Sequence, residues 1–197
     1  MDSLTVREAL PSFYAQYHLE PNGGVDQDVV KVALVKGITL YLPNVAARKK
    51  VVLKHDIHHL ITGYSALMKG EMEIGAWELS TGNNNWVAFS LNTYSIMMGV
   101  FFNLPGIWKA WVLGRHTSNL YQEKYRVEDL LHRSVHDLKA ELGLLNVADP
   151  KFSVSAFFSF AGFLVLGAVF SLLSIVLVPF MLLYTVFISI RSLWKKH

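Results

Sequence analysis

The sequence contains no cysteine. This absence excludes disulfide bonds, iron–sulfur clusters and zinc sites built from thiolates. A metal bound by this chain must therefore use histidine and carboxylate ligands. Alternating strand patterns are also nearly missing, since residues 36–42 form the only short alternating stretch. Together with repeated helical periodicity, this scarcity predicts an all-α fold.

The net charge of the chain is also small. The chain has 18 basic and 15 acidic residues, and the basic cluster Arg191, Lys195 and Lys196 accounts for the excess. The isoelectric point near 9.0 therefore does not indicate a nucleic-acid-binding surface. The first residues lack both the apolar run of a signal peptide and the arginine-rich character of a transit peptide, so we expect the first domain to stay in the cytoplasm.

Polar side chains are concentrated in the run His-Asp-Ile-His-His at 55–59, which is followed by eleven residues and Glu71. An α-helix turns by about 100° per residue, so His55, Asp56 and His59 share one arc while the remaining histidine of the run points away. Two imidazoles and two carboxylates that converge make a mixed nitrogen and oxygen site. Such a site suits a divalent metal, and zinc is the metal we expect.

The helix that carries this run should have Asn44 as its N-cap and should end at Gly63, which suits a left-handed C-cap. The chain can then reverse into a second helix over 71–80. Glu71 lies in its first turn, where the helix dipole favours a carboxylate even without a metal. Glu78 shares a face with Glu71, so it either supports a metal ligand from behind or lies on a solvated face.

Other stretches carry helix signals as well. Thr5–Glu8 reads as a capping box, and Pro11 should interrupt the helix that begins there or open a second one. Asp26 can cap a helix that runs to about Tyr41. A further amphipathic helix is expected over 127–142, ended by glycine.

The segment from Trp86 to Leu113 is mostly apolar and should form two helices that meet at Pro105. Ordinary core, a membrane interface and the wall of a long apolar tunnel all fit this composition. In the tunnel interpretation Met97, Met98 and Phe101 line the wall, and their Asp variants should lose lipid.

The end of the sequence differs from the rest, because no residue from Val154 to Ile190 is charged. A single straight helix of that length would be about 55 Å long, against about 30 Å of hydrocarbon in a bilayer. A transmembrane helical hairpin turning near 171–174 uses this length and returns the basic tail to the cytoplasmic side. A single span followed by a proline-broken segment is the alternative.

We therefore divide the chain into a metal-binding helical domain over 1–145, a linker over 146–153, a hydrophobic membrane hairpin over 154–190 and a basic cytoplasmic tail over 191–197. The hydrophobic fraction of 52% and the mean hydropathy of +0.33 agree with contact between part of the chain and lipid.

The metal motif resembles that of the Coq4 family, whose members act in ubiquinone (coenzyme Q) biosynthesis. The resemblance covers roughly residues 5 to 145 and implies that His55, Asp56, His59 and Glu71 are metal ligands. A C-terminal hairpin is not part of the family pattern, and it suggests a bacterial member anchored in the inner membrane with its domain on the cytoplasmic face. The matching segments are Thr62-Gly63-Tyr64, Gly70-Glu71, Glu73-Ile74, Ala76-Trp77-Glu78-Leu79 and, more weakly, Asn119-Leu120-Tyr121 and Leu142-Gly143-Leu144.

The resemblance implies that a prenylated quinone precursor is bound beside the metal, in association with other quinone biosynthesis enzymes. Whether the chain forms a homo-oligomer is left open by the sequence. The resemblance also implies an enzyme, a metal-dependent oxidative decarboxylase acting at C1 of a prenylated 4-hydroxybenzoate-type ring. Two alternatives stay open. The metal can be structural in a prenyl-lipid-binding scaffold without catalysis. Alternatively, His55, His58 and His59 can form one histidine box of a di-iron lipid hydroxylase or desaturase, and His132 and His136 a second. The last requires a third histidine box, which the sequence lacks.

Overall fold

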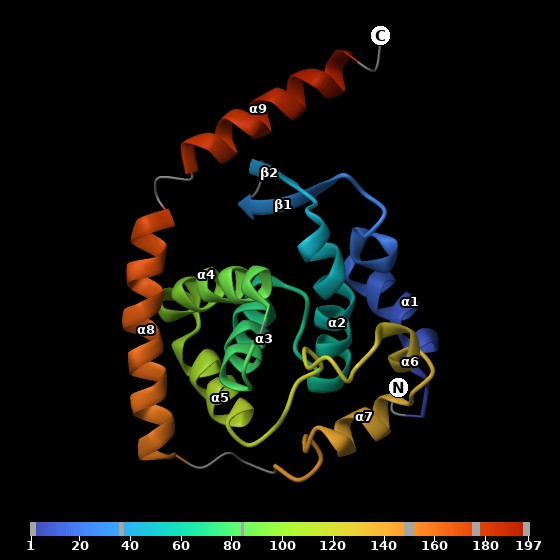
Figure 1. The fold of residues 1–197 in the computed structure, drawn as a ribbon, viewed down its shortest axis with the longest axis vertical. Helices are drawn as coiled ribbons and strands as arrows, with labels where there is room; N and C mark the ends of the chain where they lie inside the picture. Colours follow the sequence, from blue (N-terminus) through green and yellow to red (C-terminus); the bar gives the residue numbers. More distant parts are fainter. Residues whose placement is uncertain (1–2, 36–37, 84, 148–151, 175–177, 195–197) are drawn as a thin grey trace.

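The computed structural model describes residues 3–35, 38–83, 85–147, 152–174 and 178–194. These residues are mostly helical, which agrees with the predicted all-α class (Figure 1). The exception is one antiparallel hairpin of two strands, β1 (Val29–Val35) and β2 (Ile38–Pro43). A domain of packed helices is flanked by two long C-terminal helices.

Helix α1 (Val6–Tyr17) begins with the predicted capping box, in which Thr5 and Glu8 bond each other's backbone N–H groups. The predicted interruption at Pro11 is wrong, because α1 continues through it. The proline ring points to solvent, while Phe13 and Tyr14 on the other face are buried. Burial of that face outweighs the one backbone hydrogen bond that proline removes.

The helix predicted from Asp26 to about Tyr41 is wrong. A short 3₁₀ turn, η1 (Pro21–Gly24), leads instead into β1, which pairs with β2 in the register Lys31 opposite Tyr41. The two strands are rich in β-branched valine, isoleucine and threonine, which favour a pleated conformation. The alternating stretch at 36–42 overlaps β2. In this region the alternation therefore indicated the structure better than the helix cap expected at Asp26.

The centre of the domain is built from α2 (Ala46–Thr62) and α3 (Met68–Ser80). Gly63 ends α2 in the left-handed conformation, as predicted. The expected N-cap is wrong, because Val45 occupies that position and the Asn44 amide donates to the carbonyls of the preceding turn. Helix α3 starts three residues earlier than predicted and still has Glu71 in its first turn.

Helices α4 (Trp86–Phe102) and α5 (Leu104–Gly114) pack on α3 and meet at Asn103, next to the predicted break at Pro105. The helix predicted over 127–142 is divided into α6 (Val127–Leu130) and α7 (Val135–Glu141). The division arises because the chain start pairs with this segment: Val6 and Val135 donate to the carbonyls of Arg133 and Leu4.

The two C-terminal helices are α8 (Val154–Ser174) and α9 (Val178–Trp194). Within the described part of the chain, α8 alone is long and apolar enough to cross a membrane. The two helices do not lie side by side as a hairpin (Figure 1), because α8 packs on α4 and α5 while α9 reaches β2. There the Thr185 hydroxyl lies 3.3 Å from the carbonyl of Tyr41.

Candidate metal centre

Three acceptor atoms converge between α2 and α3. His55 and His59 lie one turn apart on α2, and Glu71 reaches them from the start of α3. The Nε2 atoms of the two histidines are 3.2 Å apart. One Glu71 oxygen lies 3.2 Å from His55 Nε2, and the other lies 3.3 Å from His59 Nε2. These ligand atoms lie within 4.8 Å of one another, so one ion can bind all three residues.

The other nitrogen of each imidazole is already engaged. His59 Nδ1 lies 3.0 Å from the carbonyl of Tyr64, and His55 Nδ1 lies 2.9 Å from Glu78. Both partners only accept hydrogen bonds, so each Nδ1 carries a proton. Burial alone would lower the pKa of His55, but the carboxylates of Glu78 and Glu71 outweigh it and raise that pKa well above its usual value. The proton on His55 Nε2 therefore points at Glu71, and a cation bound between His55, His59 and Glu71 would take the place of that proton. Such a group of ligand atoms fits a bound cation.

Glu78 lies behind His55 and has no exposed surface. The expectation of a solvated helix face is therefore wrong. One of its oxygens accepts from His55 and His58, and the other accepts from Asn92 and Tyr121 at 2.6 and 3.0 Å. Burial alone would raise the pKa of Glu78, but the two histidines outweigh it and hold that pKa far below its usual range. The carboxylate stays ionised and orients His55.

His58 points away from the three ligands, as helical geometry predicts. Its Nε2 accepts from the backbone N–H of Leu120 at 2.9 Å, so its Nδ1 carries the proton that is donated to Glu78 at 2.6 Å. Burial lowers the pKa of His58, which favours this neutral form. Periodicity along one helix could not reveal this role, because the partner Leu120 is far away in the sequence.

Asp56, the fourth predicted ligand, lies on the same helix but does not join the converging atoms. It is buried and accepts a hydrogen bond of 2.9 Å from the hydroxyl of Tyr14 on α1. Burial raises the pKa of Asp56. A side chain at Gly23 would come within 2.5 Å of the Asp56 carboxylate, so the turn η1 closes over this residue only because it has glycine there.

The residues predicted to line a tunnel do not enclose one. Phe101 and Met98 are 78% and 48% exposed, and Met97 packs against Gly167 of α8. Helix α4 contacts α2, α3, α5 and α8, and these contacts leave Met98 and Phe101 at the surface instead of enclosing them. A hollow of about 450 Å³ lies elsewhere, between α1 and η1, and its walls include Tyr14, the hydrogen-bond partner of Asp56.

The histidine pair of the di-iron interpretation lies outside this centre. His132 and His136 are both exposed, as predicted from the helical stripe, and they lie on the α6 and α7 side of the domain. His58, which that interpretation also needs, is held by Glu78 and the backbone of Leu120. Among the described residues, only the group of His55, His59 and Glu71 has the spacing of a metal site.

Comparison of the chain with protein-family models, with curated proteins and with solved structures finds no match.

Proposed function

We propose that this protein binds a divalent metal, with zinc as the expected ion, at His55, His59 and Glu71. The observation that carries the proposal is the pair of occupied Nδ1 atoms. Because the Tyr64 carbonyl and Glu78 accept hydrogen bonds from the two Nδ1 atoms, both Nε2 atoms are left to face one point together with the Glu71 carboxylate. Asp56 stays a proposed fourth ligand, which requires a change of its side-chain position from the bond to Tyr14.

The proposed substrate is a prenylated quinone precursor with a carboxylate or phenolate on its ring. A bound metal would supply Lewis-acid chemistry to such an anionic head group. The protein's own residues contribute orientation: Glu78 holds His55, and the carbonyl of Tyr64 holds His59. The side chain of Glu71 is 41% exposed, so the centre is accessible from one side.

The proposed reaction is the removal of the C1 carboxyl group in ubiquinone biosynthesis, as the resemblance to the Coq4 family implies. The bond between the ring carbon and the carboxyl carbon breaks, carbon dioxide leaves, and the ring carbon takes a proton. In the oxidative form a hydroxyl group replaces the carboxyl group, and an external oxidant such as dioxygen accepts the electrons. We further propose inner-membrane association with the domain on the cytoplasmic face, contact with other quinone biosynthesis enzymes, and a homo-oligomer.

A deletion strain tests the reaction. We expect it to accumulate a carboxylated prenylphenol, and we expect wild-type protein to relieve this accumulation while Glu71→Ala does not. The exposed acidic residue Glu128 is the matched control, and Glu128→Ala should behave as wild type. An unchanged quinone profile in the deletion strain would contradict the proposed pathway.

The second candidate function is a non-catalytic scaffold that binds prenyl lipid and has a structural metal. The buried network around Glu78 favours the scaffold function, because a metal at the edge of this network would fix α2 against α3. The two candidates differ in one result. If Glu71→Ala abolishes metal binding but supports normal quinone levels, the scaffold function is correct and catalysis at the metal is not.

A further inference from the structure

One side of α8 is an apolar stripe without any covering in the structure. Phe158, Val165 and Leu172 are 68%, 66% and 66% exposed and follow one another at intervals of seven residues. Seven residues make almost two full turns, so the three side chains lie in line along the helix. They form an uninterrupted hydrophobic strip over most of the length of α8.

The opposite side of α8 is packed against the domain along nearly its whole length. The Trp111 indole donates to Ser159 at 3.1 Å near the start of the helix, and Gly167 allows Met97 of α4 to approach further along. Contacts between aromatic rings join α8 and the preceding Phe152 to α4 and α5. They pair Trp108 with Phe152, Trp111 with Phe160, Phe89 with Phe163 and Tyr94 with Phe170.

This packing conflicts with a bilayer crossing. A helix of 21 residues is about 31 Å long, which is the thickness of the hydrocarbon core. If α8 crossed, α4 and α5 would be carried to the same depth, together with the exposed cations Lys109 and Arg115 of that region. Charges are strongly disfavoured in the hydrocarbon core, whereas a helix lying in the membrane plane places the domain in water.

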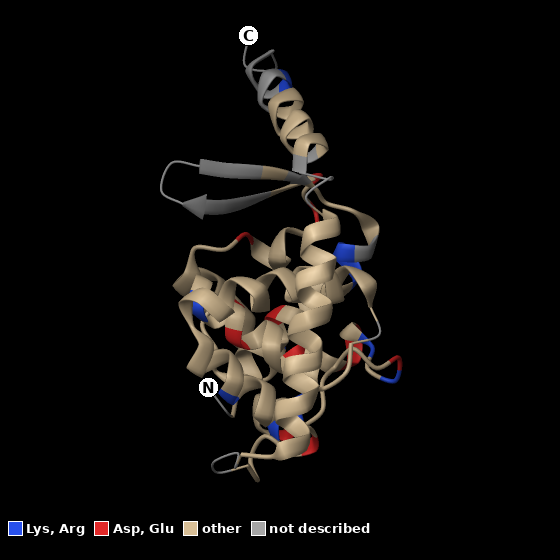
Figure 2. Ribbon diagram, turned by 90° about the vertical axis from the view of Figure 1, so that its left-hand side faces the viewer, with Lys and Arg blue, Asp and Glu red and all other residues tan. Residues whose placement is uncertain are grey.

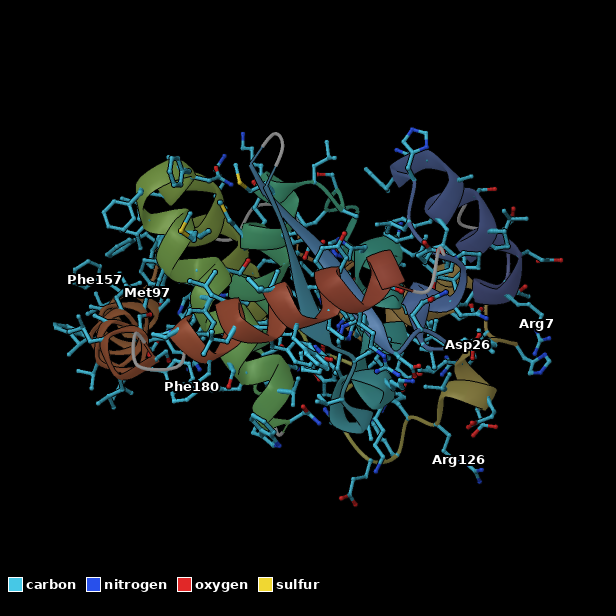
Figure 3. The ribbon with its side chains drawn as sticks, turned by 90° about the horizontal axis from the view of Figure 1, so that it is seen from above. Arg7, Asp26, Met97, Arg126, Phe157 and Phe180 are labelled. Carbon is cyan, nitrogen blue, oxygen red and sulfur yellow. The ribbon has the colours of Figure 1, made fainter. Side chains whose placement is uncertain are left out.

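Helix α4 extends the apolar strip. On its helical wheel, Tyr94 and Phe101 lie within about 60° of Met97, which faces α8, and Met98 follows about 40° further on. Their exposed positions therefore border the α8 contact. Figure 3 shows Met97 between the two helices and Phe157 on the outer side of α8. The two helices together present one surface.

The charge balance of this part of the sequence suits anionic lipid. No residue in 86–108 or 152–190 is charged, and after Asp149 the chain has the basic residues Lys151, Arg191, Lys195 and Lys196 but no acidic one. In the view from this side, α8 carries no charged residue along its length (Figure 2). An apolar segment whose flanking charged residues in the sequence are all basic binds anionic membrane surfaces.

We infer that α8 lies in the plane of a bilayer that contains anionic lipid, with Phe158, Val165 and Leu172 inserted in one leaflet and α4 touching the same leaflet beside them. This inference rests on the proposed membrane association but not on the metal or its chemistry. In this arrangement α8 contacts one leaflet of the bilayer and does not cross the membrane.

The natural absence of cysteine makes the test direct. Single variants Phe158→Cys, Val165→Cys, Leu172→Cys and Phe101→Cys of the full chain are labelled with an environment-sensitive fluorophore. Each is bound to vesicles of phosphatidylcholine and phosphatidylglycerol that contain shallow or deep spin-labelled quenchers. We expect similar, shallow depths at all four positions. His132→Cys, exposed on the α6 side, is the control and should show no quenching.

A graded depth would overturn the inference: in a crossing helix Val165 is deepest, and Phe158 and Leu172 are shallow. A chain that binds no vesicles but forms a dimer whose labels are shielded would show that a second copy covers the strip. That result would also contradict the proposed membrane association. Zinc content measured on the same samples is independent of either outcome, so a failure here leaves the metal proposal to its own test.

Discussion

The two sides of this molecule depart from the usual distribution of polar and apolar groups in opposite directions. Between α2 and α3, ionisable side chains are buried, and His58 and Glu78 have no exposed surface. Along α4 and α8, large apolar side chains are exposed, and Phe101 reaches 78%. Buried ionisable groups and exposed apolar strips are the informative exceptions in a folded protein. The comparison therefore separates the proposed site for an ion from the proposed surface for lipid.

The buried side is stable only because its groups satisfy one another. Glu78 accepts hydrogen bonds from four side chains, on α2, on α4 and in the segment after α5. Among the described residues, the buried side-chain polar atoms without a partner are Asn83 Nδ2 and Ser171 Oγ, and neither belongs to this network. Changes within the network should thus affect both folding and metal content, whereas changes in the α8 contact should affect folding and leave metal content unchanged.

The largest effect is expected for Glu78→Ala. Removal of this buried carboxylate leaves His55, His58, Asn92 and Tyr121 without their acceptor, and the free energy of unfolding should fall by about 3–5 kcal/mol. Metal content should fall with it. Urea unfolding and metal analysis measure the two effects. Glu128→Ala, in an exposed position, is the control, and equal stability of the two variants would disprove the structural role of Glu78.

His59→Ala should remove bound metal almost completely, from one ion per chain to near zero. The reason is that His59 contributes one of three ligand atoms and sits 3.3 Å from Glu71. Elemental analysis after removal of loosely bound ions measures the content. His136→Ala changes an exposed histidine of the same chain and should retain the metal. Full metal content in His59→Ala would refute the site.

His58→Ala sharpens the difference between a ligand and its support. The three ligands stay in place, but Leu120 N–H loses its acceptor and Glu78 loses one donor. We expect metal affinity to weaken about 10-fold and the free energy of unfolding to fall by about 1–3 kcal/mol. Competition with a zinc chelator gives the affinity. Metal loss as complete as in His59→Ala would mean that His58 itself binds the ion.

Gly167→Leu acts on the other side. A side chain at this position meets Met97 Sδ at 2.9 Å, so α8 must shift from α4 at a cost of about 1–2 kcal/mol. Metal content should stay at the wild-type level. Unfolding monitored by tryptophan fluorescence, with Gly162→Leu as the control at an open position of the same helix, checks both points. A loss of metal would show that the two sides are coupled.

The smallest expected effect is the dependence of the free energy of unfolding on pH in the acid range. Since the folded state holds the pKa of Glu78 far below its unfolded value of about 4.3, its contribution is present above that pH and is lost as the pH falls below it. The midpoint of urea unfolding of metal-free protein should therefore decrease from pH 5 to pH 3. In Glu78→Gln the decrease should be shallower, and an identical slope would assign the effect to other carboxylates.

Helical periodicity by itself determined much of the candidate metal centre: the shared arc of His55 and His59, the left-handed end at Gly63, and the position of Glu71 in the first turn of the next helix. These features are local, because a few adjacent turns of backbone decide them. The mostly helical class and the break between α4 and α5 are local in the same sense.

Tertiary structure decided the rest. Several features depend on residues that are far apart in the sequence. They are the hydrogen bond from Tyr14 to Asp56, the hydrogen bond that His58 accepts from Leu120, and the pairing of the chain start with the segment between α6 and α7, which divides the helix predicted there. The same holds for α8, whose composition alone suits a membrane crossing. Its packing on α4 and α5 depends on the contact between Gly167 and Met97. The pattern of residues within one helix does not determine which of its faces a neighbouring helix will cover.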